Sequence, residues 1–112
     1  DGLLEVWHGP ELARCRTDPE GAFHVTLSRP AAGAGQAPHY EVYVFARGLL
    51  RVLLTRVYLP DEAAANAADP VLRLAGDGRQ TLVAAADGAL LHWDVRLQGD
   101  RETVFFDWAP AP

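Results

Sequence analysis

Hydrophobic and polar residues alternate over several short stretches of the chain, which is the spacing of β-strands. The clearest stretch covers residues 39–46. Alternation divides it into two faces, one with His39, Glu41, Tyr43 and Phe45 and the other with Tyr40, Val42 and Val44. Both faces carry aromatic side chains, so we expect both to be covered by other parts of the protein.

Turn signals separate further strand candidates. Asp18-Pro19-Glu20-Gly21 has the residue preferences of a type I turn, and it predicts a hairpin between residues 13–17 and 23–28. Residues 30–38 are rich in glycine and alanine and are expected to form a loop. The remaining strand candidates are residues 3–7, 53–59, 80–85, 89–98 and 103–107.

Helical signals are confined to residues 61–75. Asp61 can cap a short helix over the alanine-rich residues 62–68, and Asp69-Pro70 is a typical start for a second helical turn. The pattern therefore predicts a mainly β fold, an antiparallel β-sandwich of about seven strands with a short helical excursion near 61–75. We expect residues 1–112 to form a single domain of this kind.

Composition and charge narrow the classes of partner. Ten basic and fifteen acidic residues give a net charge of −5, which argues against nucleic acid or an anionic membrane as the main partner. Cys15 is the only cysteine, so an internal disulfide is impossible and a cytoplasmic location is expected. Because Asp1 is not a natural first residue, we also expect an upstream segment to be missing.

Several stretches, taken in chain order, resemble the intradiol ring-cleaving dioxygenases. The general family resemblance lies in Glu5-Val6-Trp7, in Arg14-Cys15-Arg16-Thr17-Asp18 with Gly21-Ala22-Phe23, and in Ala37-Pro38-His39. A narrower resemblance, to alpha-type subunits that carry no iron, lies in Phe45-Ala46-Arg47-Gly48, Thr55-Arg56-Val57-Tyr58, Asp61-Glu62, Ala65-Asn66-Ala67, Asp69-Pro70-Val71-Leu72, Leu97-Gln98-Gly99 and residues 102–107.

This resemblance implies a subunit of an enzyme that opens a catechol between its two hydroxyl-bearing carbons, using non-haem ferric iron and O2. It implies protocatechuate as the substrate and 3-carboxy-cis,cis-muconate as the product. It also implies a homologous beta-type subunit as the partner, which carries the iron. The chain by itself is then expected to be an inactive, iron-free subunit of a hetero-oligomer.

The ligand pattern of the family is incomplete in this sequence. Catalytic members bind iron through two tyrosines and two histidines, and the two histidines stand at i and i+2 on one strand. The resemblance places His39 at the first histidine position and Glu41 at the second, and residues 29–33 hold no tyrosine where the family has one. The loop after Trp7 that carries the other tyrosine is shortened to residues 9–12, either naturally or because residues are absent from the sequence. We therefore expect no iron site on this chain, with His39 and Glu41 as degenerate positions.

Arg47 is the candidate for substrate binding. It follows a predicted strand within Phe45-Ala46-Arg47-Gly48, and the resemblance implies that it lines the pocket of the partner subunit. A guanidinium there can favour the approach of the substrate carboxylate. The plain alternative is an exposed charge. Arg56 and Tyr58 share one face of a strand, and we expect packing or an interface ion pair from them.

Two other functions stay open from the sequence. The first is a stand-alone β-sandwich binding module without a catalytic partner. The second is a metallo-oxygenase in which His39 and Glu41 form part of a facial triad for ferrous iron. Its third ligand would then come from His8, His24 or His92.

Overall fold

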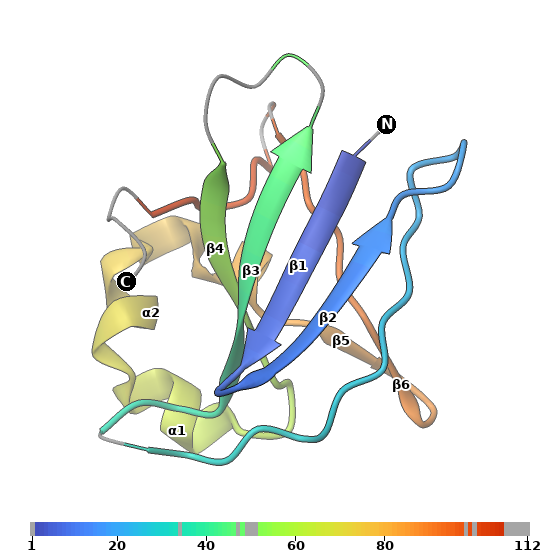
Figure 1. The fold of residues 1–112 in the computed structure, drawn as a ribbon. Coiled ribbons are helices and arrows are strands. Elements are labelled where there is room, and N and C mark those ends of the chain that lie inside the picture. The colour runs from blue at the N-terminus through green and yellow to red at the C-terminus, as the bar shows by residue number, and fades with distance from the viewer. Residues whose placement is uncertain are drawn as a thin grey trace.

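The computed structural model of the chain describes residues 2–33, 35–46, 48, 52–97, 99 and 101–106. A four-stranded antiparallel sheet has the order β2-β1-β3-β4 (Figure 1). Its strands are β1 (Gly2–His8), β2 (Glu11–Arg16), β3 (His39–Ala46) and β4 (Leu53–Tyr58). A second antiparallel sheet pairs β5 (Ala85–Asp87) with β6 (Leu90–His92).

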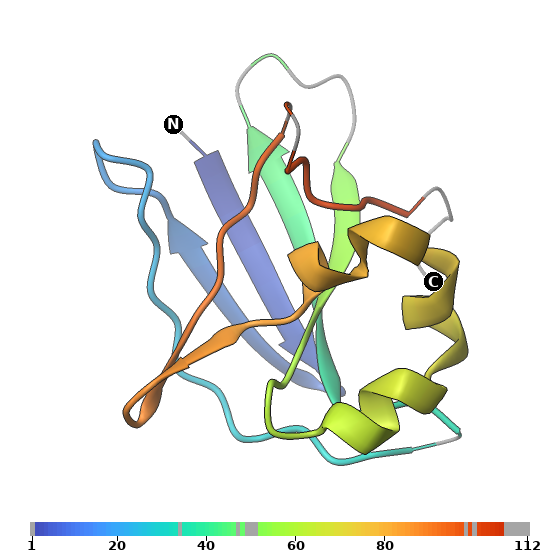
Figure 2. The same cartoon turned by 180° about the vertical axis from the view of Figure 1, so that it is seen from behind.

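Three short helices lie beside β4 in both views (Figures 1 and 2). They are α1 (Ala63–Ala68), α2 (Pro70–Leu74) and the 3-10 helix η1 (Gly76–Leu82). The predicted mainly β fold with a helical excursion near 61–75 is thereby confirmed, with six strands among the described residues. None of the helices in the described ranges is long and apolar enough to cross a membrane.

One face of the larger sheet carries the main hydrophobic core. Leu4 and Val6 of β1 meet Val42 and Val44 of β3 there, and each is at most 5% exposed. Figure 2 shows the chain after β6 running across this face, so that a second layer covers it. Trp93, Val95 and Phe105 of this chain segment pack on the core, as do Phe23, Val25 and Leu27 of the extended segment after β2. Alternation along β3 is as predicted, because Val42 and Val44 point into the sandwich.

A second, smaller core joins β4 to the helices. Tyr58 at the end of β4 and Leu82 at the end of η1 are completely buried, together with Leu72 of α2 and Ala37 of the loop before β3. This core holds the helical segment against one edge of the sheet. It also anchors the loop that leads into β3, which matters for the site described below.

The predicted hairpin partner at residues 23–28 is wrong as a strand. The turn itself is present, since Gly21 N–H donates to Asp18 O over 2.9 Å. The segment after it is extended, but no strand is assigned to residues 22–30, all of which are described. Backbone N–H groups of this segment donate hydrogen bonds to side chains of β2 instead. His24 N–H donates to Cys15 Sγ, and Ser28 N–H donates to Glu11 Oε1.

Three strand predictions in the C-terminal half need correction. Residues 80–82 complete η1 because Leu82 is drawn into the second core, and β5 begins only at Ala85. The strand expected over 89–98 is limited to β6. Residues 103–106 are extended and join the sheet through one isolated bridge between Phe106 and Leu54, while the predicted end at residue 107 lies outside the described residues. Alternation marks inward and outward side chains, but it does not show whether the backbone is paired.

The two predicted helix caps have different outcomes. Asp69 caps α2 as expected, because its side chain accepts the Leu72 N–H over 2.8 Å. Asp61 does not cap α1, which begins at Ala63 after Glu62. The Asp61 carboxylate instead accepts a 2.8 Å hydrogen bond from Arg29, so it does not bind the N–H groups at the start of α1.

Candidate functional site

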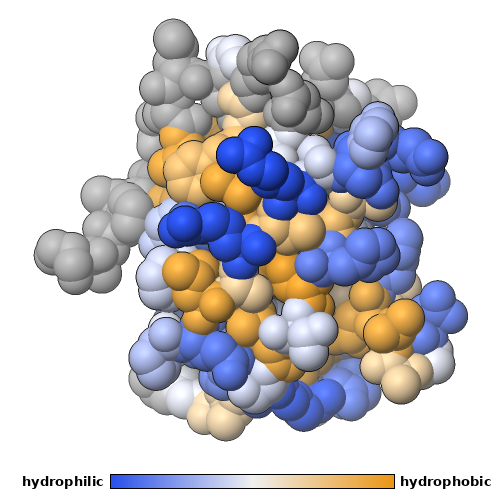
Figure 3. Space-filling model, turned by 45° about the vertical axis from the view of Figure 1, so that its right-hand side comes forward, coloured by the Kyte–Doolittle hydropathy of each residue, from blue (hydrophilic) through white to orange (hydrophobic). Residues whose placement is uncertain are grey.

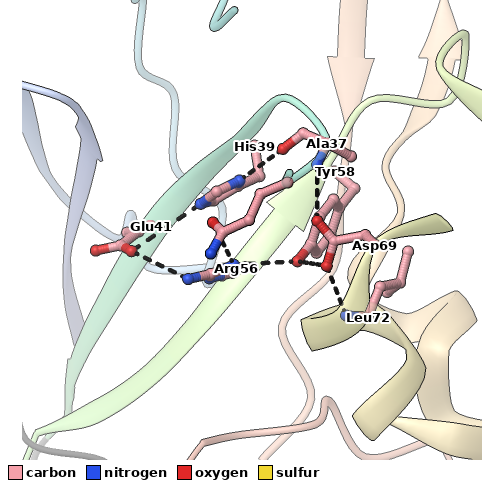
Figure 4. A network of polar contacts seen from close by, with 8 residues as sticks. Ala37, His39, Glu41, Arg56, Tyr58, Asp69 and Leu72 are labelled. Atoms are coloured by element: carbon pink, nitrogen blue, oxygen red, sulfur yellow. Dashed lines mark hydrogen bonds and ion pairs between the residues drawn. The ribbon is translucent and has the colours of Figure 1, made fainter. Parts of the chain in front are cut away.

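Four polar side chains project from β3 and β4 on the face opposite the main core. The register places Glu41 opposite Arg56 and His39 opposite Tyr58. Figure 4 shows the four side chains turned toward one another across the two strands. Two-residue spacing on each strand puts His39 with Glu41, and Arg56 with Tyr58, on the same face.

The imidazole of His39 is held in one tautomer. Its Nδ1 lies 2.8 Å from the carbonyl oxygen of Ala37, which can only accept, so Nδ1 carries the hydrogen. Nε2 therefore keeps its lone pair in the neutral ring, and it lies 4.0 Å from Glu41 Oε2. Burial lowers the pKa of His39 below its ordinary value, and the positive charge of Arg56 adds to this effect. The ring is consequently neutral near pH 7.

Arg56 is the cation of the site, and its side chain is almost fully buried. The guanidinium makes an ion pair of 3.5 Å with Glu41 Oε2 and donates over 3.3 Å to Gln36 Oε1. The same nitrogen that reaches Gln36 also lies 3.4 Å from the Tyr58 hydroxyl. The ion pair with Glu41 joins two strands of this chain, whereas packing or an ion pair at an interface was expected of Arg56.

Asp69 anchors the network from the helical side. Its Oδ1 accepts hydrogen bonds from Leu72 N–H and from the Tyr58 hydroxyl, and its Oδ2 accepts the Ala37 N–H over 2.7 Å. Burial alone would raise the pKa of Asp69, but these donors outweigh it and hold the pKa below the ordinary value. Burial raises the pKa of Tyr58 to about 12, so the carboxylate is ionised and the phenol is protonated at neutral pH.

An open groove of about 790 Å³ runs along this face of the sheet. Its wall combines the aromatic rings of Trp7 and Tyr43, 6.3 Å apart, with His39 and Glu41. The rest of its lining comes from His8, Gly9, Ala31, Gly33, Gln36 and Ala37. The indole Nε1 of Trp7 is buried and has no hydrogen-bond acceptor within the described part of the chain.

Two of the tyrosines, Tyr40 and Tyr58, make hydrogen bonds within the fold. The Tyr40 hydroxyl donates to Ser28 O over 2.8 Å, and Tyr58 is bound in the network. Strands β1 and β2 are joined directly by a tight turn at Gly9-Pro10. Within the described ranges, no three His, Cys, Asp or Glu side chains gather in a way that could hold a metal ion.

The residues that could hold ferric iron do not fit that ion. Of the two groups brought together as expected, His39 offers one imidazole lone pair, and Glu41 is already paired with a permanent cation, Arg56. Two of the three candidates for a third ligand do not line the groove: His24 is exposed, and His92 pairs with Asp94. His8 does line the groove, where its ring meets Tyr40 edge-on.

Arg47, the predicted substrate-binding residue, lies outside the described residues and stays a prediction. Sequence reasoning also missed a central residue. Asp69 was expected only as a helix cap, whereas it joins α2, β4 and the loop before β3. The Asp-Pro dipeptide indicates the start of a helix, but it does not show whether the aspartate is buried. The sequence therefore contains no signal for these further contacts.

Two known proteins with similar sequences are alpha chains of one enzyme. The chain is 49% identical over 98 residues to the protocatechuate 3,4-dioxygenase alpha chain of Burkholderia cepacia, covering 81% of this chain and 50% of that relative. It is 48% identical over 84 residues to the alpha chain of the same name from Pseudomonas putida, covering 70% and 42%. The chain thus spans about half the length of the curated relatives it matches. No family model matches the sequence.

A solved structure has the same fold. The dioxygenase domain of a dioxygenase carbohydrate-binding protein fusion from Streptomyces sp. SirexAA-E matches with a TM-score of 0.57 and 22% identity. The match covers 81% of this chain and 61% of that domain. Identity at this level shows the fold alone, and it confirms the predicted β-sandwich class.

Proposed function

Because this chain is homologous to protocatechuate 3,4-dioxygenase alpha chains over about half of their length, we propose that it is the iron-free alpha-type subunit of such an enzyme. The resemblance predicted from the sequence motifs is confirmed by these relatives. In this proposal a homologous beta-type subunit carries the ferric iron. The assembled enzyme uses O2 to cleave protocatechuate to 3-carboxy-cis,cis-muconate, and the chain is inactive by itself.

The observation that carries the proposal is the ion pair at the degenerate ligand position. Where a catalytic member needs a second imidazole, this chain has Glu41 at 3.5 Å from the Arg56 guanidinium. Ferric iron in this family also needs phenolate ligands, while the Tyr58 phenol is protonated and bound to Asp69. The side chains at this position therefore support a structural role rather than a catalytic one.

Exposed hydrophobic side chains support the proposed subunit interface. Figure 3 shows hydrophobic side chains at the surface between charged ones. Large apolar residues exposed within the described ranges are Leu12, Phe45, Leu74, Leu90, Leu91 and Leu97. Leu90 and Leu91 are consecutive in β6, so the β5–β6 hairpin exposes a large apolar side chain on each of its faces. We propose that such a surface contacts the beta-type subunit.

The proposal also covers location and the role of the groove. A cytoplasmic site of action fits a chain whose only cysteine, Cys15, is free.

The groove beside Trp7 faces away from the main core, and the buried indole N–H of Trp7 needs an acceptor. A partner subunit, or more of this chain, can supply one.

Co-purification is the test of this function. The full natural chain is produced alone and together with a beta-type subunit, and each sample is assayed for iron and for ring cleavage of protocatechuate. We expect the chain alone to self-associate, to hold no iron and to be inactive, and the co-produced complex to be active. A well-behaved monomer that ignores the beta-type subunit would instead support a binding module. Iron and activity in the chain alone would support the metallo-oxygenase that uses His39 and Glu41.

A further inference from the structure

His39 and Glu41 carry two potential metal-ligand atoms close to each other. They stand at i and i+2 on β3 and face the same groove. His39 presents the lone pair of Nε2 because Nδ1 is bound to Ala37 O, and Glu41 Oε2 lies 4.0 Å from that nitrogen. Imidazole nitrogen and carboxylate oxygen bind zinc and similar ions at about 2.0–2.2 Å, so a small rotation brings both into the shell of one ion.

The Arg56 guanidinium lies against the same carboxylate oxygen. Its distance to Glu41 Oε2 is 3.5 Å. A guanidinium has only donors and stays protonated in proteins, so it cannot serve as a ligand and cannot lose its charge. An ion bound by His39 and Glu41 would therefore lie beside a permanent positive charge, which weakens its binding strongly in a partly buried site.

The guanidinium is held in this place by the surrounding structure. Arg56 is 7% exposed, and it donates to Gln36 Oε1 and to the Tyr58 hydroxyl. Tyr58 is itself fixed by Asp69 in the second core, as Figure 4 shows. Moving the guanidinium away to admit a metal ion would break these contacts and leave buried polar groups unpaired.

We propose that the Arg56 guanidinium takes the place of a metal ion at His39 and Glu41, so that its charge is what closes a latent divalent-metal site. This inference rests on the proposed function and deepens it, because it gives the physical reason why the iron-free subunit stays iron-free. It also predicts that loss of the charge at position 56 opens the site to Zn²⁺.

Zinc binding tests the inference. The full natural chain is used with the subunits that accompany it, and zinc retained per complex is counted by elemental analysis, with affinity from competition against a fluorescent zinc indicator. The variants are Arg56→Gln, Glu41→His and the double variant, with Arg79→Gln as an exposed-arginine control. We expect Arg56→Gln to bind zinc at least about tenfold more tightly than wild type. The double variant, with two imidazoles at i and i+2, should bind most tightly.

Two further results decide the matter. Adding His39→Ala should abolish the zinc gained by Arg56→Gln, whereas zinc that persists would place the ion elsewhere and overturn the inference. Glu41→His alone keeps Arg56, so it should bind no more zinc than wild type. If that single variant binds as tightly as the double variant, the charge of Arg56 does not close the site. If Arg56→Gln fails to fold, Glu41→His compared with wild type decides the case, because this variant keeps the Arg56 charge and zinc gained by it would overturn the inference.

Iron is counted in the same samples to separate the two proposals. Wild-type iron located on this chain would overturn the proposed function, whatever zinc does. Folded Arg56 variants that gain no zinc, with wild-type iron confined to the partner, would overturn only the role of Arg56.

Discussion

The hydroxyl of Tyr58 donates a hydrogen bond of 3.1 Å to Asp69 Oδ1, and neither residue is exposed to solvent. Tyr58 ends β4 and Asp69 precedes α2, so the bond joins the sheet to the helical segment. Asp69 also accepts the Ala37 N–H, and the Ala37 carbonyl in turn orients the His39 ring. One buried carboxylate therefore fixes the position of the imidazole in the groove.

Tyr58→Phe tests the strength of this link. The substitution removes one donor from a carboxylate that stays buried, so we expect the free energy of unfolding to fall by about 1–3 kcal/mol. Tyr43→Phe is the matched control, because Tyr43 is half-buried on β3 and its ring lies tilted against that of Trp7. Its cost should stay below about 0.5 kcal/mol. Urea unfolding measures both, and equal losses would contradict a special role for the Tyr58 hydroxyl.

Asp69→Asn tests the same carboxylate through acid. Burial works against ionisation of Asp69, yet its donors keep the pKa in the folded protein below the ordinary 3.8. Since the folded value is the lower one, the stabilisation is complete above the unfolded pKa and is lost as the pH falls through the folded pKa. Asp69→Asn should be less stable than wild type near pH 7. As the pH is lowered below about 4, its free energy of unfolding should fall by less than that of wild type. Asp77→Asn, on the exposed surface of η1, should follow the wild-type acid profile.

Sequence reasoning identified the elements whose signal is local. β3 was predicted with its observed bounds because alternation and aromatic residues coincide over residues 39–46. Asp69 was identified as a helix cap from the Asp-Pro dipeptide. Its other partners, Tyr58 and Ala37, lie 11 and 32 positions away, and no local spacing records such contacts.

The candidate site was predicted in part for the same reason. His39 and Glu41 could be placed together because two-residue spacing on a strand is a local pattern. The pairing of Arg56 with Glu41 depends on the register between β3 and β4, which the hydrophobic pattern leaves open to any shift by two residues. The sequence thus predicted that Glu41 stands where the family has a histidine ligand. The structure adds that the Arg56 guanidinium pairs with Glu41.

His39→Gln tests the neutral imidazole. Burial first, and then the charge of Arg56, lower the pKa of His39 in the folded protein below 6.5. The unfolded chain takes up the proton at the higher pKa, so the stability of wild type should fall as the pH drops below about 6.5. The variant should lack this part of the decline. His24→Gln, at an exposed position, should retain it, and a decline unchanged in His39→Gln would contradict the interpretation.

Gly78→Ala tests the packing of η1. A Cβ atom at Gly78 would lie 2.6 Å from Val104 Cγ2, so either η1 or the segment that holds Val104 must move. We expect a loss of about 1–3 kcal/mol in the free energy of unfolding. Gly33→Ala is the control, because a Cβ atom there meets nothing within 4 Å and its φ is not positive. Similar losses in the two variants would show that the clash is not the cause.

Arg47→Ala tests the predicted contribution of this chain to the partner's pocket. If the Arg47 guanidinium attracts the carboxylate of protocatechuate, its loss should lower kcat/KM of the assembled enzyme by about 10–100-fold, the range of a charge-assisted hydrogen bond. Bound iron should stay unchanged, because Arg47 belongs to the chain that we propose carries no metal. Arg79→Ala, at an exposed position, should leave the kinetics unaltered.

A second substrate separates charge recognition from general damage to the pocket. Catechol lacks the carboxylate, so any slow turnover of catechol should be the same in wild type and in Arg47→Ala. A loss confined to protocatechuate then assigns the effect to the pairing of guanidinium and carboxylate. Equal losses for both substrates would mean that Arg47 shapes the subunit interface, and wild-type kinetics for both would remove it from the site.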